Sequence, residues 1–204
     1  MAVSQKQKSI RSLHLAGKSG NVCISPLEIS TKSEDALGIE LSAFNLSAAT
    51  RKHGKPFTVE ALFQSCKVFK NGGPYRDLLS VTPIEAKRDR RLKESGELIG
   101  FDLFGEKWSL EPRTAFYDWI YMNSLARNPT LLEAISKYDG FTDIEFNPKK
   151  SINCQAYSVA LFRSLTMRNL IQDVLENKEA YLCTIRESPV SSATEDTERQ
   201  PRLF

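Results

Sequence analysis

Three polar side chains near the middle of the chain have the types and spacing that catalysis on a sugar requires. If Thr58–Phe69 is a helix turning about 100° per residue, then Glu60, Gln64 and Lys67 lie on one side of it. A carboxyl group beside an amine supplies an acid/base and a nucleophile, which hydrolysis of a glycosidic bond can use. The same pattern also fits an ordinary amphipathic helix whose polar face meets water. The segment therefore indicates either a catalytic face or a solvated one.

A second candidate is a cluster of cations in the next expected helix. The cluster consists of Lys87, Arg88, Arg90, Arg91 and Lys93. Such a density of positive charge could bind phosphates or a pyrophosphate. The alternative is an exposed face on which nearby Glu and Asp residues pair with these cations. The net charge of +3 is too small to mark the whole chain as a nucleic-acid binder, so only local clustering favours phosphate binding.

The elements that must position these residues follow from capping and turn residues. Thr58 can cap the first helix, and Thr82-Pro83-Ile84-Glu85 has the form of a capping box with Pro at the first helical position. Residues 1–20 have little periodicity, and Leu37, Ile39 and Leu41 alternate as in a strand. We expect strands at 21–25, 36–44 and 180–185, and further helices over 113–125, from 128, and over 151–175. This pattern predicts one α+β domain, mostly helical, with a small β-sheet.

Length and composition support a single domain. The chain has 204 residues, of which 41% are hydrophobic, enough for one real core. We expect a flexible arm over 1–20, a catalytic domain over 21–187 and a disordered tail over 188–204. No apolar run approaches the ~20 residues of a membrane helix, and the N-terminus lacks the apolar stretch of a signal peptide. A cytoplasmic protein without membrane contact is expected.

Cysteine and histidine usage argues for metal-free chemistry. The four cysteines are far apart and form no Cys-x-x-Cys pair, and the chain has two histidines. We therefore expect no metal site and no cofactor.

Several motifs in a fixed order resemble the NADAR family. Its signature, Thr-Val-Glu, an aromatic, Gln and then Lys, is met by residues 58–60, 63–64 and 67, with Phe69 one place late. Four further landmarks follow the family order: Ser42–Asn45, Pro83–Arg91, Met122 with Asn128–Leu131, and Asn153 with Arg163. The resemblance covers residues 36–168.

Within that family the chain is most similar to the NADAR proteins that act as antitoxins to DarT-type toxins. The resemblance implies hydrolysis of the N-glycosidic link between ADP-ribose and guanine in single-stranded DNA. The toxin would then be a functional partner more than a tight physical one. Other family members act on small N-glycosides, so a phosphoribosylated metabolite is an alternative substrate. A module that binds ADP-ribose or a nucleotide without cleaving it is another.

The expected site combines the residue patterns with the resemblance. Glu60 is expected to act as acid and base, and Lys67 either as a nucleophile forming a Schiff base or as a fixed cation. Gln64 would hold a ribose hydroxyl. Expected substrate contacts further include Phe44, Asn45, Arg88, Arg91, Trp108 and Asn153, with the two arginines on the pyrophosphate and an aromatic ring on a base.

Each of these contacts has a structural alternative. Phe44 and Trp108 could instead belong to the core, Asn45 could be a turn residue, and Asn153 could cap the long helix. The chain also departs from the family pattern, with Thr114 where a Trp is usual, so Trp108 or Trp119 would have to supply that ring. The Trp-Gly that usually precedes the late Asn is replaced by Asn147–Lys150. The second half of the site is therefore less well defined by sequence than the first.

Overall fold

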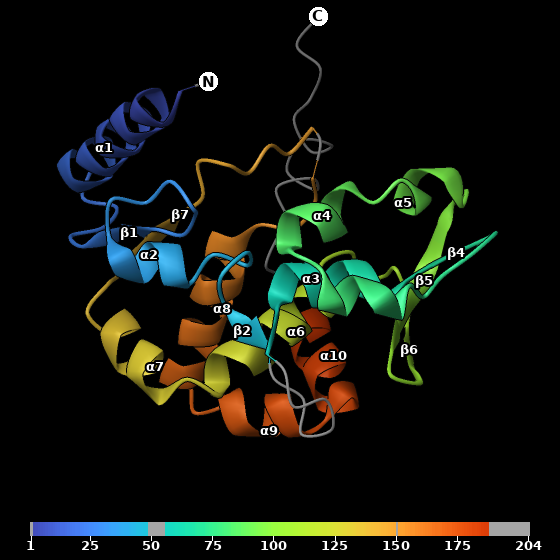
Figure 1. Cartoon of the computed structure of the whole chain (residues 1–204). Coiled ribbons are helices and arrows are strands. Elements are labelled where there is room, and N and C mark those ends of the chain that lie inside the picture. Colours follow the sequence, from blue (N-terminus) through green and yellow to red (C-terminus); the bar gives the residue numbers. More distant parts are fainter. Residues whose placement is uncertain (1, 49–55, 150, 188–204) are drawn as a thin grey trace, which may run out of the picture.

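The computed structural model describes residues 2–48, 56–149 and 151–187 (Figure 1). Its α-helices are α1 (Val3–Ser19), α2 (Ala36–Glu40), α3 (Val59–Ser65), α4 (Pro83–Arg88), α5 (Arg91–Glu94), α6 (Ala115–Ala126), α7 (Pro129–Ile135), α8 (Gln155–Met167), α9 (Ile171–Glu176) and α10 (Lys178–Glu187), with a 3-10 helix η1 (Arg76–Ser80). Its strands are β1 (Pro26–Glu28), β2 (Ser47–Ala48), β3 (Phe57–Thr58), β4 (Lys67–Phe69), β5 (Leu98–Leu103), β6 (Glu106–Trp108) and β7 (Gly140–Thr142).

The strands form small separate sheets. β4, β5 and β6 make an antiparallel sheet in that order, β2 pairs antiparallel with β3, and β1 pairs parallel with β7. The parallel pair joins the N-terminal part of the chain to the segment that follows α7, with Pro26 opposite Gly140. The predicted α+β class, mostly helical with little sheet, is confirmed.

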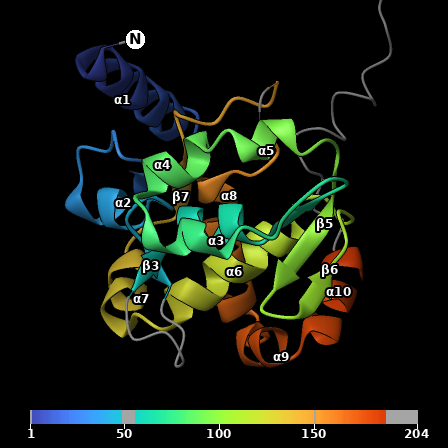
Figure 2. The same cartoon turned by 45° about the vertical axis from the view of Figure 1, so that its right-hand side comes forward.

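Helix α6 is the centre of the core. From Ala115 to Leu125 every residue except Asn123 is buried, and a helix that is apolar on all sides must be covered on all sides. The helices α3, α7, α8 and α9 contact it, and Figure 2 shows α3 lying across α6. The α3 helix is therefore held on a rigid support, so its side chains have a fixed direction.

Local hydrogen bonds set the starts of α3 and α4 as predicted. The Thr58 hydroxyl accepts a hydrogen bond from Ala61 N at 3.3 Å, which caps α3. At α4, Thr82 and Glu85 form the expected capping box. The sequence His53-Gly54-Lys55, which is typical of a turn before α3, lies outside the described residues.

The length of the first predicted helix was wrong. Helix α3 ends at Ser65, and Lys67 opens β4 opposite Phe101 instead of completing a third helical turn. The basic cluster is also divided, because the chain leaves helix at Asp89 and α5 begins only at Arg91. At Lys67, pairing of the backbone with β5 therefore replaces the helix that the sequence period predicted.

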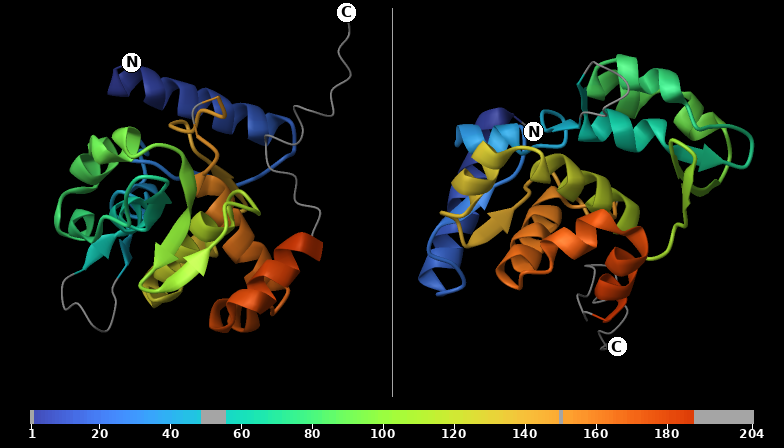
Figure 3. Two further views of the ribbon diagram at one scale, coloured as in Figure 1. Left: turned by 90° about the vertical axis from the view of Figure 1, so that its right-hand side faces the viewer. Right: turned by 90° about the horizontal axis from the view of Figure 1, so that it is seen from below.

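Two N-terminal predictions were wrong. Residues 3–19 form helix α1, not a loose arm, and it lies alongside the segment after β7 (Figure 3). The expected strand over 36–44 is instead the short helix α2, because the Asp35 carboxylate accepts a hydrogen bond from Leu37 N and caps it. Gly38 permits its close packing, since a Cβ there would lie 2.0 Å from the Glu28 carbonyl oxygen.

Three further boundaries differ. The strand expected at 21–25 instead covers residues 26–28, which form β1. The helix expected over 151–175 is broken into α8 and α9 by Asn169, which has a φ of 57°. Residues 180–185 belong to α10, whose first amides at Glu179 and Ala180 donate to the Asn177 side chain. The expected tail over 188–204 lies outside the described residues.

None of the described helices combines the length and apolar character that crossing a membrane demands.

Candidate functional site

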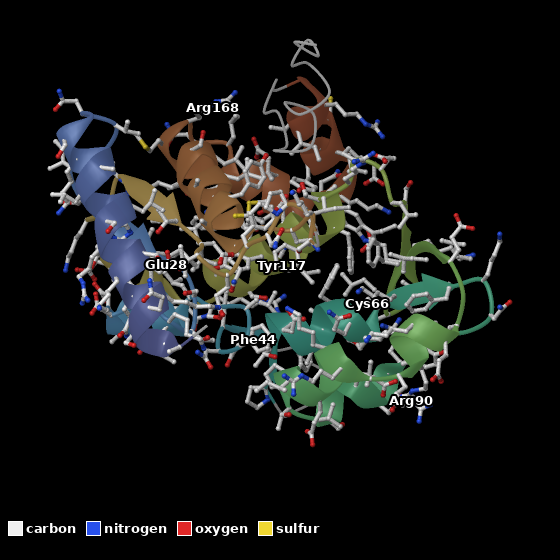
Figure 4. The ribbon with its side chains drawn as sticks, turned by 90° about the horizontal axis from the view of Figure 1, so that it is seen from above. Glu28, Phe44, Cys66, Arg90, Tyr117 and Arg168 are labelled. Carbon is white, nitrogen blue, oxygen red and sulfur yellow. The ribbon has the colours of Figure 1, made fainter. Side chains whose placement is uncertain are left out.

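A cleft of about 1220 Å³ receives side chains from both halves of the chain. One side is built by α3, the first residue of β4, and α4 with α5. Another side is built by residues of 143–149 and 151–153, which follow β7, and by Gln155, the first residue of α8. The lining further includes Phe44, the β5 residues Leu98 and Phe101, Tyr117 of α6, and Leu110, Glu111 and Arg113 between β6 and α6. Figure 4 shows Phe44 and Tyr117 near the middle of the molecule, between the N-terminal elements and α3.

Glu60 is the buried carboxylate of this cleft. Its side chain is only 7% exposed, and its backbone N–H donates to the Ala43 carbonyl at 2.9 Å. Gln64 Nε2 donates to Glu60 Oε1 at 2.8 Å, one helical turn along. Lys87 Nζ lies 3.7 Å from the same oxygen. Gln64 and Lys87 therefore hold the Glu60 carboxylate in one orientation.

Lys67 reaches the same cleft from β4. Its Nζ lies 4.8 Å from the centroid of the Phe63 ring. Burial lowers the pKa of its amine to about 8, an effect that Glu60 opposes and that the positive charge of Lys87 reinforces. A lysine with such a pKa has an appreciable fraction of free amine near neutral pH, as a nucleophile requires.

Gln64 carries an amide oxygen that lacks a partner among the described residues. Its side chain lines the cleft and is 5% exposed, yet no described residue donates a hydrogen bond to its Oε1. An unpaired buried acceptor costs free energy, so such atoms in native proteins indicate a ligand or a water that supplies the donor. A sugar hydroxyl beside Glu60 would satisfy it.

Phe44 and Lys87 form part of the same group. Lys87 Nζ lies 4.9 Å from the centroid of the Phe44 ring, so this cation contacts both the ring and the Glu60 carboxylate. Arg88, the next residue on α4, also lines the cleft and is exposed. Asn153 lines the opposite side, and it does not cap α8, which starts after Cys154.

The structure does not bring three of the expected residues to the cleft. Asn45 is exposed, and its amide donates to the Ile39 carbonyl within a turn. Arg91 is held away by the carboxylates of Asp77 and Asp89. Trp108 is 4% exposed in the core, where it packs against Trp119 and Phe116.

Sequence reasoning missed Tyr117 and Asp143. Burial, with Glu60 and other nearby negative groups, raises the pKa of Tyr117 well above its ordinary value, so this phenol stays a hydrogen-bond donor. Burial also raises the pKa of Asp143, against the hydrogen bonds that Gln155 donates to it. Tyr117 looks like any core residue in the sequence of α6, and Asp143 carried no motif by itself. The cluster of basic residues at the end of α4 indicated that one of them could bind the substrate, but the pattern did not distinguish Lys87 from the other cations of the cluster.

The described residues contain no group of three or more His, Cys, Asp and Glu side chains that could hold a metal ion. The cleft itself offers carboxylates, amines, a phenol and amides. The combination of a fixed carboxylate with an amine of lowered pKa is suited to acid/base and nucleophilic steps on a carbon–nitrogen bond.

The chain matches the model of a known protein family. A search of curated proteins finds no sequence that matches this chain. A family model described as "DarT1-associated NADAR antitoxin" matches residues 1–195, which include α1 and every residue of the cleft. The chain therefore belongs to the family of DarT1-associated NADAR antitoxins.

Proposed function

We propose that this protein removes ADP-ribose from guanine bases in DNA by cleaving the N-glycosidic bond between the ribose and the base amine. The observation that carries the proposal is the group formed by Glu60, Gln64 and Lys67, in which a buried carboxylate, an unpaired amide oxygen and an amine of pKa about 8 share one cleft. Membership of an antitoxin family supports a substrate made by the toxin.

The reaction starts with the free amine of Lys67. Its nitrogen attacks the anomeric carbon, a C–N bond to the lysine forms, and the C–N bond to guanine breaks. The attacking nitrogen loses one proton and the departing guanine amine gains one, and the Glu60 carboxylate carries the proton between them. The ribosyl-lysine opens to a Schiff base, and water then hydrolyses it to ADP-ribose and free lysine.

The remaining cleft residues hold the substrate. The Gln64 oxygen accepts a hydrogen bond from a ribose hydroxyl, which gives that buried atom the partner it lacks. Arg88 offers a guanidinium group to the pyrophosphate. Phe44 presents a ring on which a base can stack.

The test is release of ADP-ribose from a single-stranded oligonucleotide that carries ADP-ribosyl-guanine. Mass spectrometry should show unmodified guanine and free ADP-ribose as products. Glu60→Gln and Lys67→Ala should each abolish release while the thermal unfolding midpoint changes little. Borohydride should trap a ribosyl adduct on Lys67 in the wild type. Full turnover by either variant would exclude the roles assigned to these residues.

The same incubation separates the enzyme from a binding module. Tight binding of the modified oligonucleotide without product would support a module that sequesters the base. Parallel reactions with ADP-ribosyl-thymine and with small phosphoribosyl N-glycosides define the substrate class.

A further inference from the structure

Helix α1 precedes the region that the sequence motifs cover, yet it contacts the cleft side formed by residues 143–146. Only Ile10 of α1 is buried, so polar contacts hold much of this helix. Two of them are ion pairs at 2.6 Å, one from Lys6 to Glu145 and one from Arg11 to Glu34. Glu145 lines the cleft, whereas Glu34 does not.

A second line of hydrogen bonds joins α1 to the same segment. His14 Nε2 lies 2.9 Å from the Thr142 hydroxyl, which donates to Glu28 Oε2 at 2.5 Å. Glu28 is 1% exposed, and its other carboxylate oxygen accepts from Ile144 N at 2.8 Å. Figure 4 shows Glu28 beside α1. Thr142 and Ile144, the residues on either side of Asp143, are therefore hydrogen-bonded to the N-terminal elements, Thr142 through its hydroxyl and Ile144 through its backbone N–H.

Asp143, within the same 143–146 segment, is held by a separate set of hydrogen bonds. Asp143 accepts hydrogen bonds from the side chain and the backbone of Gln155, and Gln155 Oε1 accepts from Ala43 N at 2.6 Å. Ala43 in turn holds the backbone of Glu60 through its carbonyl oxygen. A continuous set of contacts thus runs from α1 through the 143–146 segment to the catalytic side of the cleft.

The Lys6–Glu145 ion pair is less exposed to water than the Arg11–Glu34 ion pair. The Lys6 and Glu145 side chains are 24% and 30% exposed, against 58% and 42% for Arg11 and Glu34. Burial raises the pKa of Glu145, but the Lys6 ammonium and the Thr31 hydroxyl outweigh it and hold the pKa below its ordinary value. Less exposed pairs are screened less by water, so Lys6 contributes more to the order of its partner.

We propose that Lys6 of α1 is a positioning residue for the cleft: its ion pair with Glu145 holds the 143–146 segment where the substrate contacts it. Lys6 is not among the residues that line the cleft and acts only through Glu145. The catalytic readout of this inference depends on the proposed function, but the effect on the backbone does not.

The experiment compares Lys6→Ala with Arg11→Ala in the full chain. Both variants remove one cation of α1 and one ion pair, but only the first pair reaches the cleft. Amide hydrogen exchange across residues 142–147 should be at least several-fold faster in Lys6→Ala and unchanged in Arg11→Ala. The KM for the ADP-ribosylated oligonucleotide should rise about fivefold in Lys6→Ala, with kcat nearly constant, as loss of one partly exposed ion pair allows. Lys6→Arg should restore both values.

Each other result overturns the proposal. Unchanged exchange in Lys6→Ala would show that the pair does not order the segment. Equal effects in the two variants would show that α1 acts only through general stability, and so would a failure of Lys6→Arg to restore KM. Faster exchange with unchanged KM would show that the substrate does not use this segment. If the wild type releases no ADP-ribose from any substrate, the proposed function fails, and hydrogen exchange alone then decides whether Lys6 positions the segment.

Discussion

The lowered pKa of the Lys67 amine predicts how the release of ADP-ribose depends on pH. Burial is the main cause of the decrease from 10.5 to about 8, and Lys87 contributes to it while Glu60 opposes it. The reacting form is the free amine, so the rate should rise as pH rises through 8 and then level off.

The magnitude follows from that pKa. With a pKa of about 8, roughly one tenth of the amine is free at pH 7 and roughly nine tenths at pH 9. The single-turnover rate should therefore increase about tenfold between these two pH values. An amine with an ordinary pKa would be free to well under ~0.1% at pH 7, and its rate would still be climbing tenfold per pH unit at pH 9.

The assay is single-turnover release of ADP-ribose between pH 6 and 10. Lys87→Met removes a charge that lowers the pKa of Lys67, so the midpoint of its profile should move to higher pH. Lys93→Met is the matched control, because Lys93 lines the cleft but does not contribute to the lowered pKa. A wild-type rate that is independent of pH between 7 and 9 would refute the role of the free amine. An unchanged midpoint in Lys87→Met would refute its electrostatic coupling to Lys67.

Two further predictions concern stability. Burial raises the pKa of Asp118, which is 2% exposed and accepts a hydrogen bond from Ser158 at 2.6 Å, to about 7. Between pH 4 and 7 the native state therefore holds a proton that the unfolded state has lost, so the free energy of unfolding falls as pH rises. Between pH 5 and 8 the wild type should lose about 2–3 kcal/mol of unfolding free energy relative to Asp118→Asn, as measured by urea unfolding. A constant difference between the two proteins would contradict the raised pKa. Thr82→Ala should cost ~1 kcal/mol by the same measurement, because it removes the cap of α4, and Thr82→Ser should retain most of that stability.

Helix starts illustrate what local sequence can predict. Thr58 and Thr82 each satisfy amide groups within three residues, so the information needed to place α3 and α4 lies next to them in the chain. Alternation of apolar and polar residues over a short segment was a weaker guide to secondary structure. Leu37, Ile39 and Leu41 have the period of a strand, yet they belong to a short capped helix. Short apolar runs have this ambiguity because both periods match them.

The site was predictable in part for the same reason. Glu60 and Gln64 are one helical turn apart, and their hydrogen bond follows directly from that spacing. Lys67 was expected beside them through a longer helix, and it lines the same cleft from β4 because the chain turns at once into the sheet. Arg91 had the right charge for the cleft, but Asp77, fourteen residues earlier, holds its guanidinium group elsewhere.

The amino-acid sequence by itself therefore determined the α+β class, the caps of α3 and α4, and the carboxylate–amide pair, all of which depend on neighbours within about one helical turn. Only the tertiary structure decided that Lys87, Tyr117 and Asp143 line the same cleft as that pair while Trp108 enters the core. Those choices depend on contacts between residues far apart in the chain. Burial is also the main cause of the lowered pKa of Lys67, with Lys87 adding to it and Glu60 opposing it, so the reactivity of that residue is a property of the folded cleft.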